Sequence, residues 1–223
     1  MAETVAITGA NRGIGHALAS AYAARGDKVV GTYRTTAPPP LAGTHWVQAD
    51  VSAPRSLQEV RAAVGEKGLD LLICNAGVYL DRGHSLPDGF EPELWAESFA
   101  TNVTGVFETV RAFLPELQAA APSRIAVIAS NMGNASRSAG GSYIYRASKA
   151  AVINLARNLA TDLAPAGIAV GAYHPGWVRT DMGGTGAALD VETSVTGLIR
   201  AFDALSTKQA GQFLNYDGEN LLM

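Results

Sequence analysis

The chain has 223 residues, of which 48% are hydrophobic and 17% are charged, a composition typical of one globular domain with a sizeable core. Its formal net charge of −3, without any basic run, excludes the electrostatic footprint of proteins that bind nucleic acids or anionic membranes, so the expected partners are small molecules. The single Cys74 cannot form an internal disulfide, and no signal peptide or transmembrane segment is recognisable, so we expect a cytoplasmic location.

Seven short apolar runs, each bounded by Gly, Pro, Asp or Ser, predict strands. They span residues 4–7, 28–32, 45–49, 69–74, 124–129, 168–173 and 212–215. Helical patterns lie between most of them, at residues 13–25, 56–64, 94–117, 147–163 and 192–204. This alternation predicts a single-domain α/β Rossmann fold over residues 1–223, with a seven-stranded parallel sheet covered by helices on both faces.

Three segments are predicted to be loops. The prolines at positions 38–40 cannot continue a helix or a central strand. Segments 79–93 and 182–190 contain glycines and follow predicted strands, at the edge where open parallel sheets bind their ligands. We therefore expect the last two segments to line a substrate site.

A glycine-rich stretch, TGANRGIG at residues 8–15, follows the first predicted strand and leads directly into a helix. Glycines there let the backbone turn sharply and approach a pyrophosphate, and the N–H groups of the helix N-terminus attract its charge. An ordinary tight turn is the alternative. The position between a strand and a helix favours dinucleotide binding.

Tyr145 and Lys149 are four residues apart at the start of a helical pattern, so their side chains share one helix face. A cation beside a phenol favours the phenolate, so we expect Lys149 to lower the pKa of Tyr145 and to make it a proton donor for carbonyl reduction. Taken alone, the pair is more typical of a solvated helix face.

These motifs together resemble the short-chain dehydrogenase/reductase family. Its pattern of Thr-Gly-x-x-x-Gly-x-Gly, Asn-Ala-Gly and Tyr-x-x-x-Lys occurs in order at residues 8–15, 75–77 and 145–149, and a Pro-Gly loop follows at residues 175–180. The Tyr-Arg-x-Ser-Lys sequence and the ending at residues 213–218 are most similar to C-factor and sniffer-type carbonyl reductases. The resemblance covers essentially the whole chain.

The resemblance implies a catalytic set of Asn102, Ser130, Tyr145 and Lys149. Tyr145 would donate a proton to the carbonyl oxygen while Ser130 hydrogen-bonds the same oxygen. Lys149 would hydrogen-bond the nicotinamide ribose, and Asn102 would hold a water that passes protons to it. The alternatives are that Ser130 only caps a strand end and that Asn102 only satisfies a helix kink.

The end of the second strand bears on the choice of cofactor. NAD enzymes place an acid there to bind the ribose 2′-OH, whereas this chain has Arg34 and no acid. Arg34, together with Arg12 in the glycine-rich loop, matches a 2′-phosphate, so we predict NADP(H) over NAD(H). The alternative is that both arginines are solvated surface bases.

The resemblance also implies the residues that would bind the cofactor. Asp50 would accept from the adenine amine and Val51 would pack on the ring, although Asp50 could instead be a loop cap. No metal site is expected. The implied cofactor-binding residues are Gly9, Asn11, Arg12, Gly13, Ile14, Gly15, Arg34, Asp50, Val51, Asn75, Ala76, Gly77, Tyr145, Lys149, Pro175, Gly176, Val178 and Thr180.

The substrate site is less well determined by the sequence. Apolar residues flank the motifs and form either a pocket or part of the core, namely Tyr79, Met132, Tyr143, Trp177 and Met182. The short 182–186 loop indicates a small or open pocket, suited to aldehydes, ketones or quinones. His174 is interpreted as a packed loop histidine.

The leading hypothesis is thus an NADP(H)-dependent oxidoreductase that interconverts a small carbonyl compound and its alcohol. The alternative is a dinucleotide-binding regulatory or signalling protein of the C-factor type. The helices predicted at 94–117 and 147–163 form subunit interfaces in many family members, so the resemblance also implies a homodimer or homotetramer.

Overall fold

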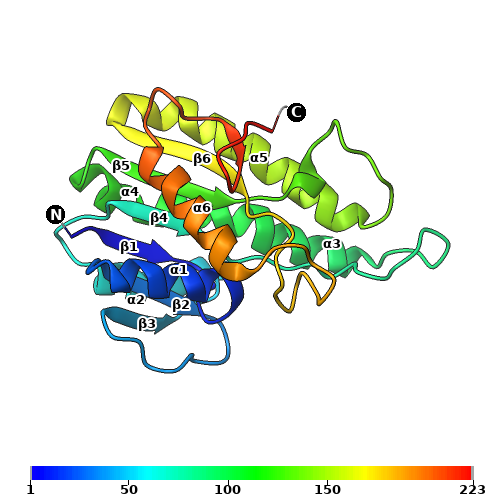
Figure 1. The fold of residues 1–223 in the computed structure, drawn as a ribbon, viewed down its shortest axis with the longest axis horizontal. Coiled ribbons are helices and arrows are strands. Elements are labelled where there is room, and N and C mark those ends of the chain that lie inside the picture. The colour runs from blue at the N-terminus through cyan, green and yellow to red at the C-terminus, as the bar shows by residue number, and fades with distance from the viewer. Residues whose placement is uncertain (1, 222–223) are drawn as a thin grey trace.

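The computed structural model describes residues 2–221 and contains one seven-stranded parallel sheet. The strand order is β3-β2-β1-β4-β5-β6-β7. This order confirms the predicted Rossmann architecture (Figure 1). The strands are β1 (Thr4–Ile7), β2 (Lys28–Tyr33), β3 (Thr44–Gln48), β4 (Leu71–Cys74), β5 (Ser123–Ile128), β6 (Ile168–His174) and β7 (Phe213–Asn215).

Helices cover both faces of the sheet. Figure 1 shows α1 and α6 in front of the strands, and α2, α4 and α5 pack on the opposite face. The α-helices are α1 (Gly13–Ala24), α2 (Leu57–Val64), α3 (Pro92–Phe99), α4 (Gly105–Ala119), α5 (Tyr143–Leu163) and α6 (Val191–Ala204). Short 3₁₀ helices span Pro54–Ser56, Asn131–Gly133 and Ala164–Ala166, and a π-helix spans Ala100–Thr104.

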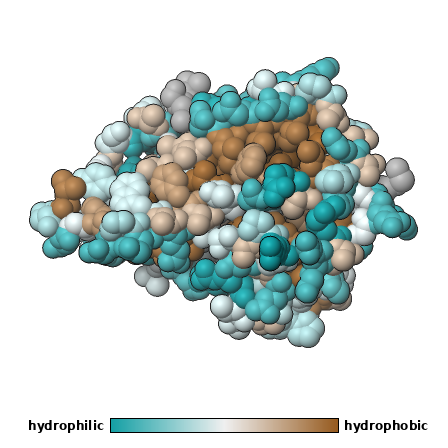
Figure 2. All heavy atoms as spheres, turned by 180° about the vertical axis from the view of Figure 1, so that it is seen from behind, coloured by the Kyte–Doolittle hydropathy of each residue, from teal (hydrophilic) through white to brown (hydrophobic). Residues whose placement is uncertain are grey.

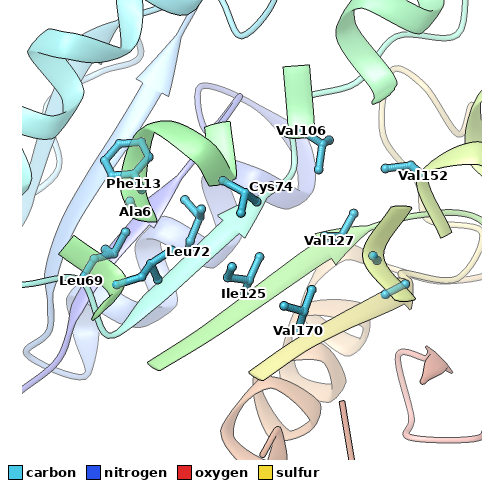
Figure 3. Packing of buried hydrophobic residues seen from close by; sticks show 14 of the residues in the cluster. Ala6, Leu69, Leu72, Cys74, Val106, Phe113, Ile125, Val127, Val152 and Val170 are labelled. Carbon is cyan, nitrogen blue, oxygen red and sulfur yellow. The ribbon is translucent and has the colours of Figure 1, made fainter. Parts of the chain in front are cut away.

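The core consists of two apolar layers, one on each side of the sheet. Figure 3 shows the layer under α4 and α5, where Leu72, Ile125 and Val170 project from neighbouring strands together with Phe113 and Val152 from the helices. All five side chains are fully buried, and each contributes roughly 1.5–3 kcal/mol by leaving water. Central strands buried on both faces read as continuous apolar runs, which is why the sequence revealed them.

Two elements differ from their predicted form. The helix expected at 94–117 is interrupted by the π-helix Ala100–Thr104, which hydrophobic spacing does not reveal. The helix expected from residue 147 starts at Tyr143, so that Tyr145 lies within its first turns. The segment with the three prolines lies in the irregular connection between β2 and β3, as predicted.

Candidate functional site

The glycine-rich loop is packed too tightly for side chains at two of its glycines. A Cβ atom on Gly9 would lie 2.9 Å from the Ala76 Cα, and one on Gly15 would lie 2.5 Å from the Asn75 Nδ2. Gly9 also has a φ of 62°, in the left-handed region. The loop after β1 and the loop after β4 are therefore in direct contact.

Hydrogen bonds hold these two loops together. The Asn75 Nδ2 donates to the carbonyl oxygens of Thr8 (3.0 Å) and Gly9 (2.8 Å). In return, the Thr8 hydroxyl accepts from the backbone N–H groups of Asn75 (3.0 Å) and Ala76 (3.1 Å). Asn75 thus fixes the shape of the glycine-rich loop.

A first cavity of about 270 Å³ lies beside these loops at the carboxyl edge of the sheet. It is lined by all the residues implied to bind the cofactor except Gly176 and Val178, which line the neighbouring cavity. Thr32, Thr35 and Asp181 also line it and were not predicted, and Met182, which was predicted for the substrate pocket, lines it as well. The structure therefore brings together residues as far apart in the chain as Gly9 and Met182.

The two arginines considered for a 2′-phosphate both line the first cavity. The Arg12 Nη1 lies 2.7 Å from the Asp181 Oδ2, and both side chains are exposed. Arg34 forms no ion pair within the described part of the chain. Sequence reasoning missed Asp181 because nothing local marks a partner so distant along the chain.

Asp50 caps its own loop and also lies where it could contact a cofactor. Its Oδ1 accepts from the backbone N–H (2.9 Å) and the hydroxyl (2.7 Å) of Ser52, so it does cap its own loop. It also lines the first cavity beside Val51, which is buried against Gly105.

Tyr145 and Lys149 lie one turn apart on α5, and both are buried. The Lys149 Nζ donates to the carbonyl oxygen of Ile128 (2.9 Å) and lies 5.7 Å from the centroid of the Tyr145 ring. A Cβ atom on Gly77 would lie 3.6 Å from this Nζ and 3.2 Å from the Asn102 Oδ1. Lys149 and Asn102 therefore converge on Gly77.

The expected effect of Lys149 on Tyr145 is wrong for this structure. Burial raises the pKa of Tyr145 to about 12, and a hydrogen bond with Ser130 opposes that rise only in part. Burial likewise lowers the pKa of Lys149 to about 8. Desolvation of the charged form is the largest cause of each shift, Lys149 is not among the charges that move the pKa of Tyr145, and the ammonium donates to the Ile128 carbonyl.

Ser130 lies just beyond β5, two residues after Ile128, which is the last residue of that strand. Its Oγ accepts from the backbone N–H of Met132 (3.1 Å) and so caps the 3₁₀ helix Asn131–Gly133. Ser130 also acts to lower the pKa of Tyr145, so its hydroxyl lies near the phenol. Ser130 thus caps a helix and at the same time faces the phenol.

Asn102 is fully engaged inside the π-helix. Its Oδ1 accepts from the N–H of Val78 (2.8 Å), and its Nδ2 donates to the Val78 carbonyl (2.9 Å) and to the Ser148 Oγ (3.0 Å). Asn102 therefore holds the loop after β4 against α5. The helix irregularity anticipated at this residue is real.

A second cavity of about 450 Å³ adjoins the first. Tyr145 lines both cavities, whereas Ser130 lines only the second and Lys149 only the first. The Tyr79 ring stacks on the Tyr145 ring with 4.3 Å between centroids. The other predicted pocket residues that line this cavity are Met132, Trp177 and Met182.

Two expectations for this pocket need correction. Tyr143 does not line the cavity, because its ring packs edge-on against Phe90 on the outside of α5. His174 does line it and is the last residue of β6 rather than part of a loop. Burial lowers the pKa of His174 to about 4, so its ring is neutral near pH 7.

Asp81 is a residue of this site that the sequence did not reveal. It is 1% exposed, and its carboxylate accepts from the backbone N–H groups of Ile144 (2.8 Å) and Tyr145 (3.2 Å). Ser142, the residue before α5, has a φ of 49° and provides no side-chain cap. Asp81 therefore caps α5 from a distant loop.

A larger cavity of about 670 Å³ lies between α6 and the β6–β7 edge and contains none of the predicted site residues. We assign the candidate functional site to the two smaller cavities, because polar side chains converge there at Tyr145, and the size of a cavity does not by itself indicate a function.

Within residues 2–221 there is no group of three His, Cys, Asp or Glu side chains arranged to hold a metal ion. None of the helices described is long and apolar enough to cross a bilayer.

The chain is similar in sequence and fold to known proteins. The family model described as short chain dehydrogenase matches residues 3–188. C-signal of Myxococcus xanthus is 40% identical over 151 residues, which cover 67% of this chain and 90% of that protein. The NADPH-bound carbonyl reductase from chicken fatty liver has a TM-score of 0.90 at 30% identity and covers 100% of this chain and 99% of its own. The carbonyl reductase Sniffer of D. melanogaster has a TM-score of 0.90 at 27% identity, with 100% of both chains covered.

Proposed function

Because the chain belongs to the short-chain dehydrogenase/reductase family, we propose that it is an NADP(H)-dependent carbonyl reductase. It would interconvert a small ketone, aldehyde or quinone and the corresponding alcohol. The observation that carries this proposal is the position of Tyr145 between the two cavities, with Lys149 on one side and Ser130 on the other. A proton donor at such a boundary can serve a substrate that lies beside a bound dinucleotide.

The first cavity fits a dinucleotide. The close contacts at Gly9 and Gly15 leave the loop without side chains at those points, and the loop leads directly into the N-terminus of α1. Such a terminus attracts a pyrophosphate. When bound there, a nicotinamide dinucleotide supplies the hydride.

The protein's own residues handle the proton. With a pKa of about 12, Tyr145 remains protonated at neutral pH and can donate to the oxygen of a carbonyl in the second cavity. Ser130, which lines the second cavity together with Tyr145, would stabilise the same oxygen as it gains negative charge. Lys149, with a pKa of about 8, would return a proton to Tyr145, and Asn102 would keep the adjoining loop in place.

Arg34 supports the preference for NADP(H). It follows the last residue of β2, lines the first cavity and has no carboxylate partner among the described residues. Arg12 lines the same cavity but is paired with Asp181. The solved carbonyl reductase from chicken, itself NADPH-bound, supports the same choice.

A signalling role of the C-factor type is the second candidate, because the similarity to C-signal reaches 40% identity. A protein that only binds a dinucleotide has no need for a buried Tyr–Ser–Lys arrangement facing a second cavity. This arrangement favours the enzyme.

The test is NADPH oxidation, followed by absorbance, with a panel of small aldehydes, diketones and quinones. We expect Tyr145→Phe to lose about 10²–10⁴-fold in kcat/KM, the usual worth of a general acid, while its Kd for NADPH changes little. Full activity in Tyr145→Phe would contradict the mechanism. Tight NADPH binding without turnover of any carbonyl would favour the signalling candidate.

We also infer a homo-oligomer formed through α4 and α5. Figure 2 shows the face opposite α1 and α6, where hydrophobic side chains gather in a broad area bordered by hydrophilic ones. Phe107 of α4 is 42% exposed, and the partly buried Leu114, Leu155 and Leu159 belong to the same two helices. An apolar face of this kind fits a second copy of the chain.

A further inference from the structure

The second cavity has an unusual charge. Three arginines line it, Arg82, Arg137 and Arg146, and no Asp or Glu does. The chain as a whole carries more acidic than basic residues, 20 Asp and Glu against 17 Lys and Arg. A purely cationic lining therefore runs against the composition and marks the cavity as selective for negative charge.

Two carboxylates in neighbouring segments, Asp81 and Asp181, are engaged elsewhere. Asp81 accepts from the N-terminal N–H groups of α5 and does not line the cavity. Asp181 lines the first cavity and pairs with Arg12. Neither neutralises the arginines of the second cavity.

Contacts with the protein hold two of the three guanidinium groups, those of Arg146 and Arg82. Arg146 donates to the carbonyl oxygens of Gly141 (3.1 Å) and Met132 (3.3 Å), which fixes it in the wall. Arg82 lies 4.8 Å from the centroid of the Tyr79 ring and donates to the Met182 carbonyl. No ion pair involves any of the three within the described residues.

The charge lies close to the reacting group. Arg82 covers the Tyr79 ring, and that ring stacks on Tyr145 at 4.3 Å. The positive charge of Arg82 also acts to lower the pKa of Tyr145, although burial outweighs it. The rest of the lining is largely apolar and includes Trp177, Met132 and Met182.

From this arrangement we propose that the substrate is a carbonyl compound carrying a carboxylate, with its apolar body in the second cavity and its carboxylate against Arg82 and Arg137. Arginine binds a carboxylate through two parallel N–H donors, so either side chain could hold this end of the substrate. This inference rests on the proposed function, since it takes the second cavity to be the substrate site.

The test compares 4-formylbenzoate with 4-formylbenzamide, two aldehydes of nearly the same shape that differ by one charge. We expect kcat/KM to be about tenfold higher for the carboxylate, and high salt to reduce this ratio. Arg137→Gln and Arg82→Gln should bring the ratio toward one. Arg157→Gln is the matched control, because Arg157 is exposed on α5 outside both cavities.

A second measurement separates this inference from the proposed function. Calorimetric titration with benzoate and benzamide needs no turnover, and tighter binding of benzoate that is lost in Arg137→Gln supports the anion site by itself. Reduction of both aldehydes with equal kcat/KM would overturn the inference and leave the reductase standing. Absence of any reduction would instead count against the reductase, and equal binding of benzoate and benzamide would then overturn the anion site as well.

Discussion

The carboxylate of Asp81 caps the helix that carries Tyr145, from 64 residues earlier in the chain. Each of its two oxygens accepts one backbone N–H from the first turn of α5. The residue just before the helix, Ser142, is in the left-handed region and offers no side-chain cap. The orientation of the proposed proton donor therefore depends on the loop after β4.

Replacing Asp81 by Ala should lower the free energy of unfolding by about 1–2 kcal/mol, the usual cost of losing a helix cap. It should also lower kcat, because the first turn of α5 would fray at Tyr145. Asp81→Asn keeps one acceptor and should be milder. Urea unfolding and NADPH oxidation measure the two effects, and unchanged midpoints in both variants would argue against the capping role.

Gly133→Ala should also damage the site. A Cβ atom there would lie 2.5 Å from the backbone carbon of Lys149 and 2.6 Å from the N of Ala150, so the 3₁₀ helix after Ser130 would have to move away from α5. Overpacking of this kind costs about 1–3 kcal/mol. Gly186→Ala is the control, since its nearest neighbour would be 3.9 Å away. Equal unfolding midpoints for the two variants would contradict the prediction.

The pH dependence of carbonyl reduction should follow Lys149. Its pKa of about 8 lies below the ordinary value, so the ammonium loses its proton as pH rises through about 8, whereas Tyr145 stays protonated up to about 12. The kcat/KM for reduction should therefore be highest below pH 8 and fall above it. In Lys149→Arg the cation persists, so the fall near pH 8 should disappear from the profile. A fall that survives in this variant would assign the titration to another group.

Arg34→Asp should shift the cofactor preference from NADP(H) toward NAD(H). A carboxylate at the end of β2 would repel a 2′-phosphate and could accept a hydrogen bond from a ribose 2′-OH. The ratio of kcat/KM for NADPH to that for NADH should drop by about tenfold or more. Arg55→Asp, on the 3₁₀ helix Pro54–Ser56 and outside the first cavity, controls for the change in net charge. A ratio that stays constant in Arg34→Asp would refute the assignment.

Phe107→Glu should weaken self-association, because it places a charge in the apolar face of α4 and α5. Light scattering after size exclusion would report a smaller mass for this variant than for the unchanged protein. Leu86→Glu changes an even more exposed side chain, 67% accessible, in the loop between β4 and α3, and should leave the mass unaltered. The same mass for Phe107→Glu as for the unchanged protein would exclude this interface.

Most of the fold was predictable because its signals are local. Strands such as β4 and β6 are buried on both faces, so every residue of β4 and the first five of β6 are small or apolar. Glycine and proline residues indicated where the connections lie. No observed strand end differs from its predicted end by more than two residues. At Asn102 the sequence suggested only a possible kink, and no local signal specified that it takes the form of a π-helix.

Only those residues of the site that belong to a sequence motif could be predicted. The positions of Tyr145, Ser130 and Lys149 come from such motifs, and the structure brings all three together. The cap at Asp81 and the pair between Arg12 and Asp181 join residues that are far apart in the chain. The pKa of Tyr145 was misjudged because spacing shows the neighbouring cation but does not show how deeply both groups are buried.

The shared wall at Tyr145 has a consequence for inhibitor chemistry. Since Tyr145 borders both cavities, a single compound with a nucleotide-like end and an apolar carboxylate-bearing end would occupy the two at once if they hold the proposed cofactor and substrate. Joining two such ends makes the second contact intramolecular, which raises affinity beyond that of either fragment. A bisubstrate compound of this design would compete with both reactants of the same enzyme.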